Sequence, residues 1–340
     1  MKAMKQEPDG ELELGLAHYH AHRYALADEA FARALAKPDP PAWVRFRRAR
    51  IAERSGRAED ALDELRQYYA NGGSSPFASL LEAACHDRLR RDRARRGAME
   101  RAAALVERDP ASLVAVPGVA PRGQEDALRR LRSAVSEHPS DVARRCLLAE
   151  QLLEAGEPEE AELHALSALA IAASPQAAAL AGRAALAVGR GGEATCRLTA
   201  AVDRAARFAD FLLWLGLSHF GIGALLDAQR AATASLAGNP AHGAAYRLLA
   251  LVLFRSGDEA RASLALRRGM ARGREPHEAR ASVACASAGC GTMDDAAVLE
   301  SAIARHPEYP DLKLALDRVL EAYGAGRRQT GTRMLQAAGL

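Results

Sequence analysis

The distribution of apolar and polar residues between positions 211 and 240 predicts two helices folded against each other. Leucines and a phenylalanine make a broad face of the first helix apolar, and Gly216 leaves a hole on that face. Gly221 and Gly223 end this helix, and the second helix carries a narrow stripe of small residues at helical spacing, Ala228, Ala232 and Ser235. Small residues opposite a hole allow two antiparallel helices to pack closely. Such a hairpin buries its apolar face only against a neighbour on each side.

The same pattern recurs through nearly the whole chain at intervals of 32 to 34 residues. The position of the first small residue of the stripe is alanine in all units except the third, where Arg95 stands instead: Ala27, Ala61, Ala127, Ala161, Ala194, Ala228, Ala262 and Ala296. Twelve residues earlier the chain always has Gly or Ala. Five residues earlier most units have glycine: Gly56, Gly156, Gly189, Gly223, Gly257 and Gly291. Three linked columns that stay in phase predict a solenoid of helical hairpins.

These columns resemble the tetratricopeptide repeat, a 34-residue pattern of Leu-Gly, then Ala, then Phe, then Pro. The residues that carry the resemblance are Leu14, Gly15, Ala27, Phe31, Ala34 and Pro38 in unit one, and Leu215, Gly216, Ala228 and Pro240 in unit seven. The resemblance covers about residues 8–323, with leucine or histidine in some columns that the family fills with aromatic residues. It implies an all-α, right-handed solenoid of about nine TPR-like hairpins closed by a C-terminal capping helix.

The repeat phase divides the chain into segments with different expected regularity. They are a disordered N-terminus (1–10), units one to three (11–109), an irregular unit four (110–139), regular units five to nine (140–307), a capping helix (308–323) and a tail (324–340). The first helix of unit four would have to pass Pro117, Gly118 and Pro121. Prolines and glycine disfavour a full helix there, so we expect an irregular loop or one short turn and a bend in the superhelix.

Composition supports a helical, Ala/Leu-built core, because 49% of the residues are hydrophobic and only 5% are aromatic. The net charge of +3 is close to balance, and the basic residues are nearly all Arg, which is typical of a GC-rich bacterial genome. Five cysteines without a Cys-x-x-Cys pair favour a reducing compartment. The N-terminal segment lacks a signal-peptide h-region and no apolar run has membrane-span length, so we expect a cytoplasmic protein.

Candidate catalytic and metal chemistry is sparse. His18 and His22 have the i,i+4 spacing that can ligate a metal, and His20 lies between them. The repeat phase instead places His18 in a packed column and His22 in a turn, so these histidines are interpreted as structural or surface residues. No phosphate loop or Ser-His-Asp arrangement stands out. The sequence therefore predicts no catalytic residues, no metal and no cofactor.

A dense group of arginines on unit three could meet phosphate or an acidic partner. Its members are Arg88, Arg90, Arg91, Arg93, Arg95, Arg96 and Arg101. Three acidic residues interrupt the group, and it lacks the interleaved aromatic residues that stack on nucleic-acid bases. A solvated helix surface is the favoured interpretation, and nucleic-acid binding is the alternative.

The concave groove is the remaining candidate site. In the family, ligands usually lie against the first helices of the units, and the corresponding positions here suggest a mixed apolar and basic surface. The predicted partner-binding residues are Trp43, Phe46, Arg50, Arg54, Glu150, Arg183, Leu213, Leu217, Phe220, Arg247, Leu251, Phe254 and Arg255. This set suits an amphipathic helix or extended peptide with some acidic residues. The same positions can instead pack on the chain's own next turn or termini.

The favoured function is a non-catalytic protein–protein interaction scaffold or adaptor that binds a peptide or helix of a partner protein. An accessory subunit of an enzyme complex, or a catalytic module in units three and four, is the alternative of a different class. Nucleic-acid binding through residues 88–101 is the third hypothesis. Groove variants, activity mapped to residues 71–124 and the salt dependence of binding distinguish the three.

Overall fold

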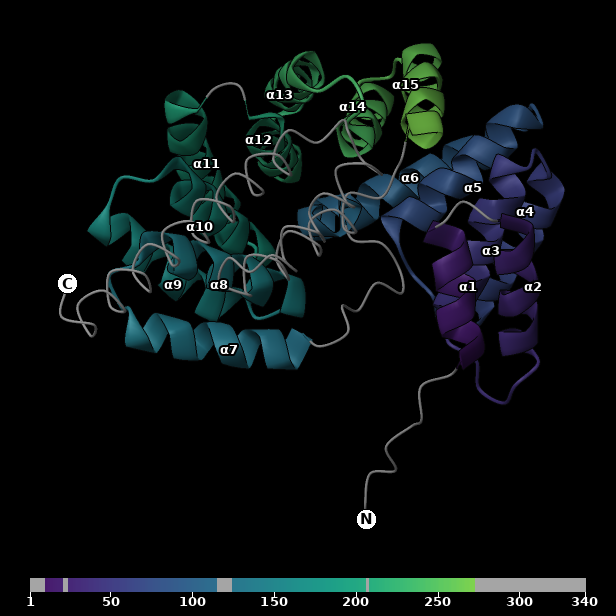
Figure 1. Ribbon diagram of the computed structural model, residues 1–340. Helices are drawn as coiled ribbons and strands as arrows, with labels where there is room; N and C mark the ends of the chain where they lie inside the picture. Colours follow the sequence, from purple (N-terminus) through teal and green to yellow (C-terminus); the bar gives the residue numbers. More distant parts are fainter. Residues whose placement is uncertain (1–9, 21–23, 115–123, 206–207, 273–340) are drawn as a thin grey trace, which may run out of the picture.

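The computed structural model describes residues 10–20, 24–114, 124–205 and 208–272. Within these ranges the chain forms α-helices and one short 3-10 turn, η1, and no strand (Figure 1). In chain order the elements are α1 (Gly10–His20), α2 (Tyr24–Leu35), α3 (Trp43–Arg54), α4 (Ala58–Ala70), α5 (Pro76–Arg88), α6 (Asp92–Arg108), η1 (Pro110–Leu113), α7 (Gln124–Glu137), α8 (Val142–Ala155), α9 (Pro158–Ile171), α10 (Pro175–Ala187), α11 (Gly191–Arg204), α12 (Ala209–Gly221), α13 (Leu225–Gly238), α14 (Gly243–Arg255) and α15 (Glu259–Arg272).

Consecutive helices pair into hairpins, and consecutive hairpins stack on one another. The pairs are α1 with α2, α3 with α4, α5 with α6, α8 with α9, α10 with α11, α12 with α13 and α14 with α15. The predicted all-α solenoid is confirmed. Unit nine, the capping helix and the tail lie outside the described residues. In unit four, for which an irregular loop or one short turn was expected, the described residues before α7 include the short turn η1, and α7 packs on α8. Pro117, Gly118 and Pro121 lie outside the described residues.

The glycine column marks the turn inside each hairpin. Every described member of the column has φ between 78° and 82°, a left-handed conformation that glycine adopts without a Cβ clash: Gly56, Gly156, Gly189, Gly223 and Gly257. In unit three the same position holds Arg90, which also has a positive φ of 55°. The backbone therefore makes the same turn even where the sequence departs from the repeat.

The close packing predicted for unit seven is present. A Cβ built on Gly216 in α12 would lie 3.3 Å from Ala231 Cβ and 3.4 Å from the Ala228 carbonyl oxygen of α13. It would also lie 2.9 Å from Leu248 Cδ2 of the next hairpin. Gly216 thus lets α12 touch both its own partner helix and the following unit.

Replacing Gly216 with leucine is expected to destabilise the protein by about 1–3 kcal/mol, because the new side chain overpacks this three-helix contact. Urea unfolding followed by helical circular dichroism measures the loss. Gly192→Leu is the matched control, because a Cβ at Gly192 has no neighbour within 4 Å. An equal loss in both variants would contradict this account of the packing.

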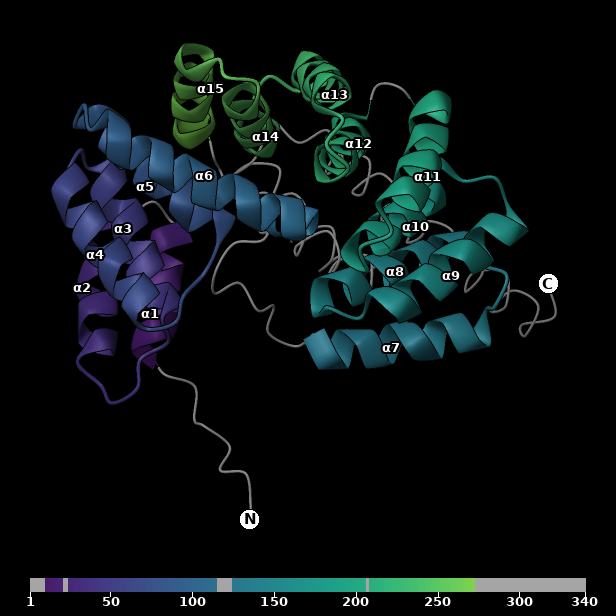
Figure 2. The same cartoon turned by 180° about the vertical axis from the view of Figure 1, so that it is seen from behind.

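Within the described ranges, three clusters of buried hydrophobic side chains can be distinguished. The first joins α1, α2 and α3, and the second joins α7, α8, α9 and α10. The largest runs from α3 through α6 and the end of η1 to the helices α10–α15, so it joins segments far apart in the sequence. Figures 1 and 2 show the result: α1–α6 form one arm, α7–α15 form a second arm, and the two meet where α14 and α15 lie against α6 and α5.

Candidate functional site

The predicted groove residues separate into two sets by burial. One set is at most 2% exposed: Phe46, Arg50, Leu213, Leu217, Phe220, Arg247 and Leu251. The other set keeps part of its surface accessible: Trp43, Arg54, Glu150, Arg183, Phe254 and Arg255. The first set consists of two arginines and five apolar residues, which we call the apolar floor.

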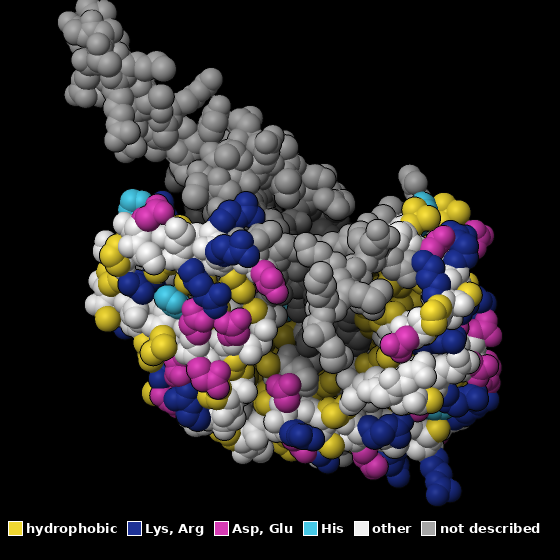
Figure 3. Space-filling view, turned by 90° about the horizontal axis from the view of Figure 1, so that it is seen from below, with side chains coloured by type: hydrophobic (Ala, Val, Ile, Leu, Met, Phe, Trp, Pro, Cys, Tyr) yellow, Lys and Arg dark blue, Asp and Glu magenta, His cyan; other side chains and the backbone are white. Residues whose placement is uncertain are grey.

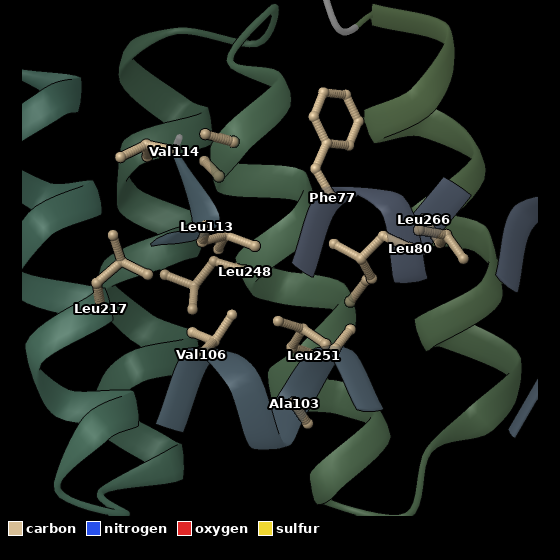
Figure 4. Close-up of a cluster of buried hydrophobic side chains, with 14 of the residues drawn as sticks. Phe77, Leu80, Ala103, Val106, Leu113, Val114, Leu217, Leu248, Leu251 and Leu266 are labelled. Atoms are coloured by element: carbon tan, nitrogen blue, oxygen red, sulfur yellow. The ribbon is translucent and has the colours of Figure 1, made fainter. Parts of the chain in front are cut away.

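The apolar floor is covered by the chain's own residues. Figure 4 shows Leu217, Leu248, Leu251 and Leu266 of the C-terminal arm packed with side chains of α5, α6 and the η1 region in one buried cluster. We call this contact the closure; its residues from the N-terminal side are Phe77, Leu80, Ala103, Val106, Leu113 and Val114. The interpretation in which this face packs on the chain itself therefore describes the buried set. A role of these positions in partner binding stays a prediction.

An aromatic ring with two guanidinium groups lies inside the closure. Arg50 Cζ is 5.1 Å and Arg247 Cζ is 4.5 Å from the centroid of the Phe77 ring. The Phe77 side chain is 1% exposed. Arg50 Nη1 also lies 3.3 Å from the buried Glu53 carboxylate, and Arg88 pairs with the same carboxylate at 2.9 Å. Desolvated cation–π contacts of this kind contribute up to about 2 kcal/mol each.

Ion pairs surround the apolar part of the closure. Arg95 of α6 lies 3.1 Å from the Glu259 carboxylate and 2.5 Å from the Ser263 hydroxyl, both in α15. Arg255 pairs with Glu107 at 2.6 Å across the same contact. The side chain of Arg95 occupies the position that is alanine in the other units, and it is only 9% exposed. The exception in the repeat column is thus the residue that joins the two arms.

A charged part of the concave face remains accessible on α8 and α10. Arg183 Nη1 lies 3.4 Å from Glu150 Oε1, and its Cζ lies 4.6 Å from the centroid of the Trp214 ring. Next to this pair, Gln151 Nε2 donates to Glu154 Oε2 at 3.0 Å. The side chains of Arg183 and Glu150 are 13% and 24% exposed, so both reach solvent. We call the accessible charged residues Glu150, Glu154 and Arg183 the charged wall; Gln151, which bonds to Glu154, is buried.

The other accessible predicted residues lie elsewhere. In the N-terminal arm, Arg54 lies over the Tyr24 ring and donates to its hydroxyl, and Trp43 makes an edge contact with Phe31 at 6.2 Å. Phe254 packs at the edge of the largest core. The structure thus does not bring the predicted residues into one continuous groove surface.

The arginine group of unit three is largely neutralised within the molecule. Its ion pairs are Arg88 with Glu53, Arg91 with Glu59, Arg95 and Arg96 with Glu259, and Arg101 with Glu82. Figure 3 shows acidic and basic side chains interspersed over the described surface seen from below. A single-sign patch, which nucleic-acid binding would favour, is not formed by these residues. Binding of nucleic acid through residues 88–101 stays a prediction.

The described part of the chain offers little support for a metal site or for a reactive cysteine at Cys85. No group of three or more His, Cys, Asp or Glu side chains there could hold a metal ion. His18 lies on α1, and His22 lies outside the described residues. Burial, aided by the negative charge of Glu53, raises the pKa of the Cys85 thiol to about 12. Cys85 is therefore a protonated core residue at neutral pH, and not an activated nucleophile.

Membrane-spanning helices are absent from the described ranges, where none of the helices combines the length and the apolar character that a bilayer crossing requires.

Stacked helical hairpins with a common turn and a common small-residue contact define the class of α-solenoid repeat proteins. A Tetratricopeptide repeat family model matches residues 12–76, and the same columns continue through the later described hairpins. Residues 12–76 thus match the tetratricopeptide repeat family, and the later described hairpins repeat the same turn and helix pairing. This fold is typically non-catalytic.

Several solved structures are similar to parts of the chain. MamA residues 41–end from Desulfovibrio magneticus RS-1 is 21% identical, covers 45% of this chain and 87% of its own, and has a TM-score of 0.40. TTC0263, a thermophilic TPR protein of Thermus thermophilus, is 20% identical over 53% of this chain and 99% of its own, with a TM-score of 0.37. The human IFIT1 dimer with PPP-AAAA is 14% identical over 99% of this chain and 84% of its own, with a TM-score of 0.41. No curated protein sequence matches the chain.

Proposed function

We propose that the protein is a non-catalytic protein–protein interaction scaffold that binds a partner segment at the charged wall of α8 and α10. The observation that carries the proposal is the Arg183–Glu150 pair beside Trp214, which lies on successive first helices of the repeat. First helices line the concave face on which TPR proteins usually bind peptides or helices. The wall is an accessible part of that face in which a charged side chain lies beside an aromatic ring.

Arg183 is the group of the wall that an acidic side chain of the partner would contact. An acidic group could replace Glu150 as the partner of Arg183 without leaving a guanidinium unpaired, since the pair is solvent-accessible. An extended peptide or an amphipathic helix would present such groups in register with the repeats. The partner could itself be an enzyme, in which case the protein is an accessory subunit. A reducing, cytoplasmic compartment belongs to this proposal, because the described cysteines are free thiols.

The alternative is a catalytic module in units three and four, which would be detected by enzymatic activity and not by partner binding. What supports the scaffold over it is the packing of those units, where α5, α6 and η1 are committed to the closure. Activity that maps to residues 71–124 would reverse this preference.

Charge reversal at Arg183 is the test. The Arg183→Glu variant of the full chain is expected to bind its partner at least about tenfold more weakly than wild type, because repulsion replaces attraction at the wall. Affinity capture from the source cells identifies the partner, and calorimetry with the purified partner measures the dissociation constant. Arg230→Glu on the convex helix α13 is the matched control, as its side chain is 71% exposed. Equal partner binding by Arg183→Glu and wild type would overturn the proposed site.

A further inference from the structure

A short segment of the chain lies in the groove of the C-terminal arm. It consists of Asp109–Val114, which we call the strap, and it contacts α10, α12 and α14 as well as α6. Pro110 and Leu113 are buried, and Val114 is 8% exposed. The strap therefore occupies first-helix surface of the kind on which TPR proteins bind partner segments.

The strap satisfies most of its backbone locally. The Asp109 side chain accepts from the Ala111 N–H at 3.1 Å, and the Asp109 carbonyl oxygen accepts from the Ser112 N–H at 3.1 Å. The Val114 N–H donates to the Ala111 carbonyl oxygen at 3.2 Å. A segment whose turn is closed by its own hydrogen bonds needs little from the groove except room for its apolar side chains.

The groove is shaped for these side chains. A Cβ built on Gly221, at the end of α12, would lie 2.9 Å from Pro110 Cγ, so the missing side chain makes room for the proline ring. Leu113 lies beside Leu217, Leu248 and Val106 in the buried cluster (Figure 4). The Leu113 carbonyl oxygen accepts from Arg247 Nη2 at 3.4 Å. Proline ring, leucine and carbonyl oxygen are thus each recognised by a feature of the C-terminal arm.

The strap is held differently from the rest of the closure. Helices α5 and α6 contribute long apolar faces and the ion pairs of Arg95, Arg96 and Glu107 with α14 and α15. The strap contributes a proline ring, two apolar side chains and a carbonyl. Release of the strap would leave these contacts of α5 and α6 with α14 and α15 in place.

We propose that the seat of the strap is a second docking surface, which binds a partner segment of the same chemistry in exchange for the strap. The occupant is a short turn-forming segment with proline followed three residues later by Leu-Val, as in Pro110–Val114. The inference extends the proposed scaffold function, and it predicts that the strap competes with the partner. Because the strap fills the seat for part of the time, the apparent affinity for a partner segment is the intrinsic affinity multiplied by the fraction of time for which the seat is empty.

The strap's own sequence is the probe. A fluorescein-labelled peptide of residues 107–115 is titrated with the full-length protein and followed by fluorescence polarisation. The double variant Leu113→Ser/Val114→Ser weakens the strap, and it is expected to bind the peptide at least about tenfold more tightly than wild type. Pro110→Ala removes only the ring next to Gly221 and weakens the strap less. It should therefore raise the affinity for the peptide by a smaller factor than the double variant does. A peptide of scrambled sequence should bind neither variant.

A glycine pair shows whether the peptide occupies the same seat. Adding Gly221→Ala to the double variant should weaken peptide binding several-fold, because the new methyl group meets the proline ring. Adding Gly192→Ala should leave it unchanged, since a Cβ there has no neighbour within 4 Å.

Equal peptide binding by wild type and both opened variants, or no binding by variants that keep wild-type helical circular dichroism, would overturn the exchange. If Gly221→Ala left the affinity for the peptide unchanged, the peptide would not occupy the seat of the strap. The Arg183→Glu measurement is independent of the strap. Loss of partner binding there, combined with no peptide binding by the opened variants, would leave the scaffold function standing and remove only the second surface.

Discussion

Replacing Phe77 with alanine is expected to destabilise the protein by about 3–5 kcal/mol, the usual cost of truncating a fully buried phenylalanine. The ring lies in the largest core, among the side chains of the closure (Figure 4). Its loss would leave a cavity and would remove the cation–π contacts of Arg50 and Arg247. Urea unfolding followed by circular dichroism at 222 nm, a standard helix signal, would show the loss as a lower midpoint.

Phe208→Ala is the matched control for this measurement. Phe208 is 39% exposed and stacks on Phe211 at 5.1 Å, outside the closure. Its truncation should cost no more than about 1 kcal/mol. If both variants lost the same small stability, the closure would not be the principal contact between the arms.

Replacing Arg95 with alanine is expected to destabilise the protein by about 1–3 kcal/mol. This is the second large effect, and it opposes the repeat pattern, in which alanine is the regular residue at this position. The substitution would remove the contacts with Glu259 and Ser263 and leave a space between α6 and α15. Two carboxylates that lie near Arg95 would still have a basic partner: Glu259 pairs with Arg96, and Asp87 pairs with Arg267. The loss therefore stays below that of breaking an isolated buried ion pair.

Thermal unfolding of Arg95→Ala and of Arg93→Ala distinguishes a contact of Arg95 between the two arms from a stabilising effect of the repeat-consensus alanine. Arg93 lies on the same helix and is exposed, so its substitution should change stability by less than about 0.5 kcal/mol. A repeat-consensus effect would make Arg95→Ala more stable than wild type, and that outcome would contradict the role of Arg95 in joining the two arms.

The candidate site could be predicted only in part. The repeat phase correctly placed Arg183 and Glu150 on first helices, because a position within a repeat determines the face of the hairpin. It left open whether Leu217 and Leu251 would be covered, because the same repeat positions face an open groove in one protein and pack on the chain itself in another. Two departures from the pattern were the available signals: arginine in the alanine column at Arg95, and the proline-rich first half of unit four.

The sequence by itself determined the local architecture of this protein. Its periodicity specified helical hairpins, glycine placed the turns at positive φ, and Gly216 with the small residues of α13 set the distance between paired helices. Each of these features depends on residues within about one repeat of each other, so the pattern contains them. The closure joins residues more than 130 positions apart, such as Leu113 and Arg247. That contact depends on the direction in which the chain leaves unit four and on the curvature of several stacked hairpins. For this reason, only the tertiary structure decided that residues of the chain itself fill the groove of the C-terminal arm.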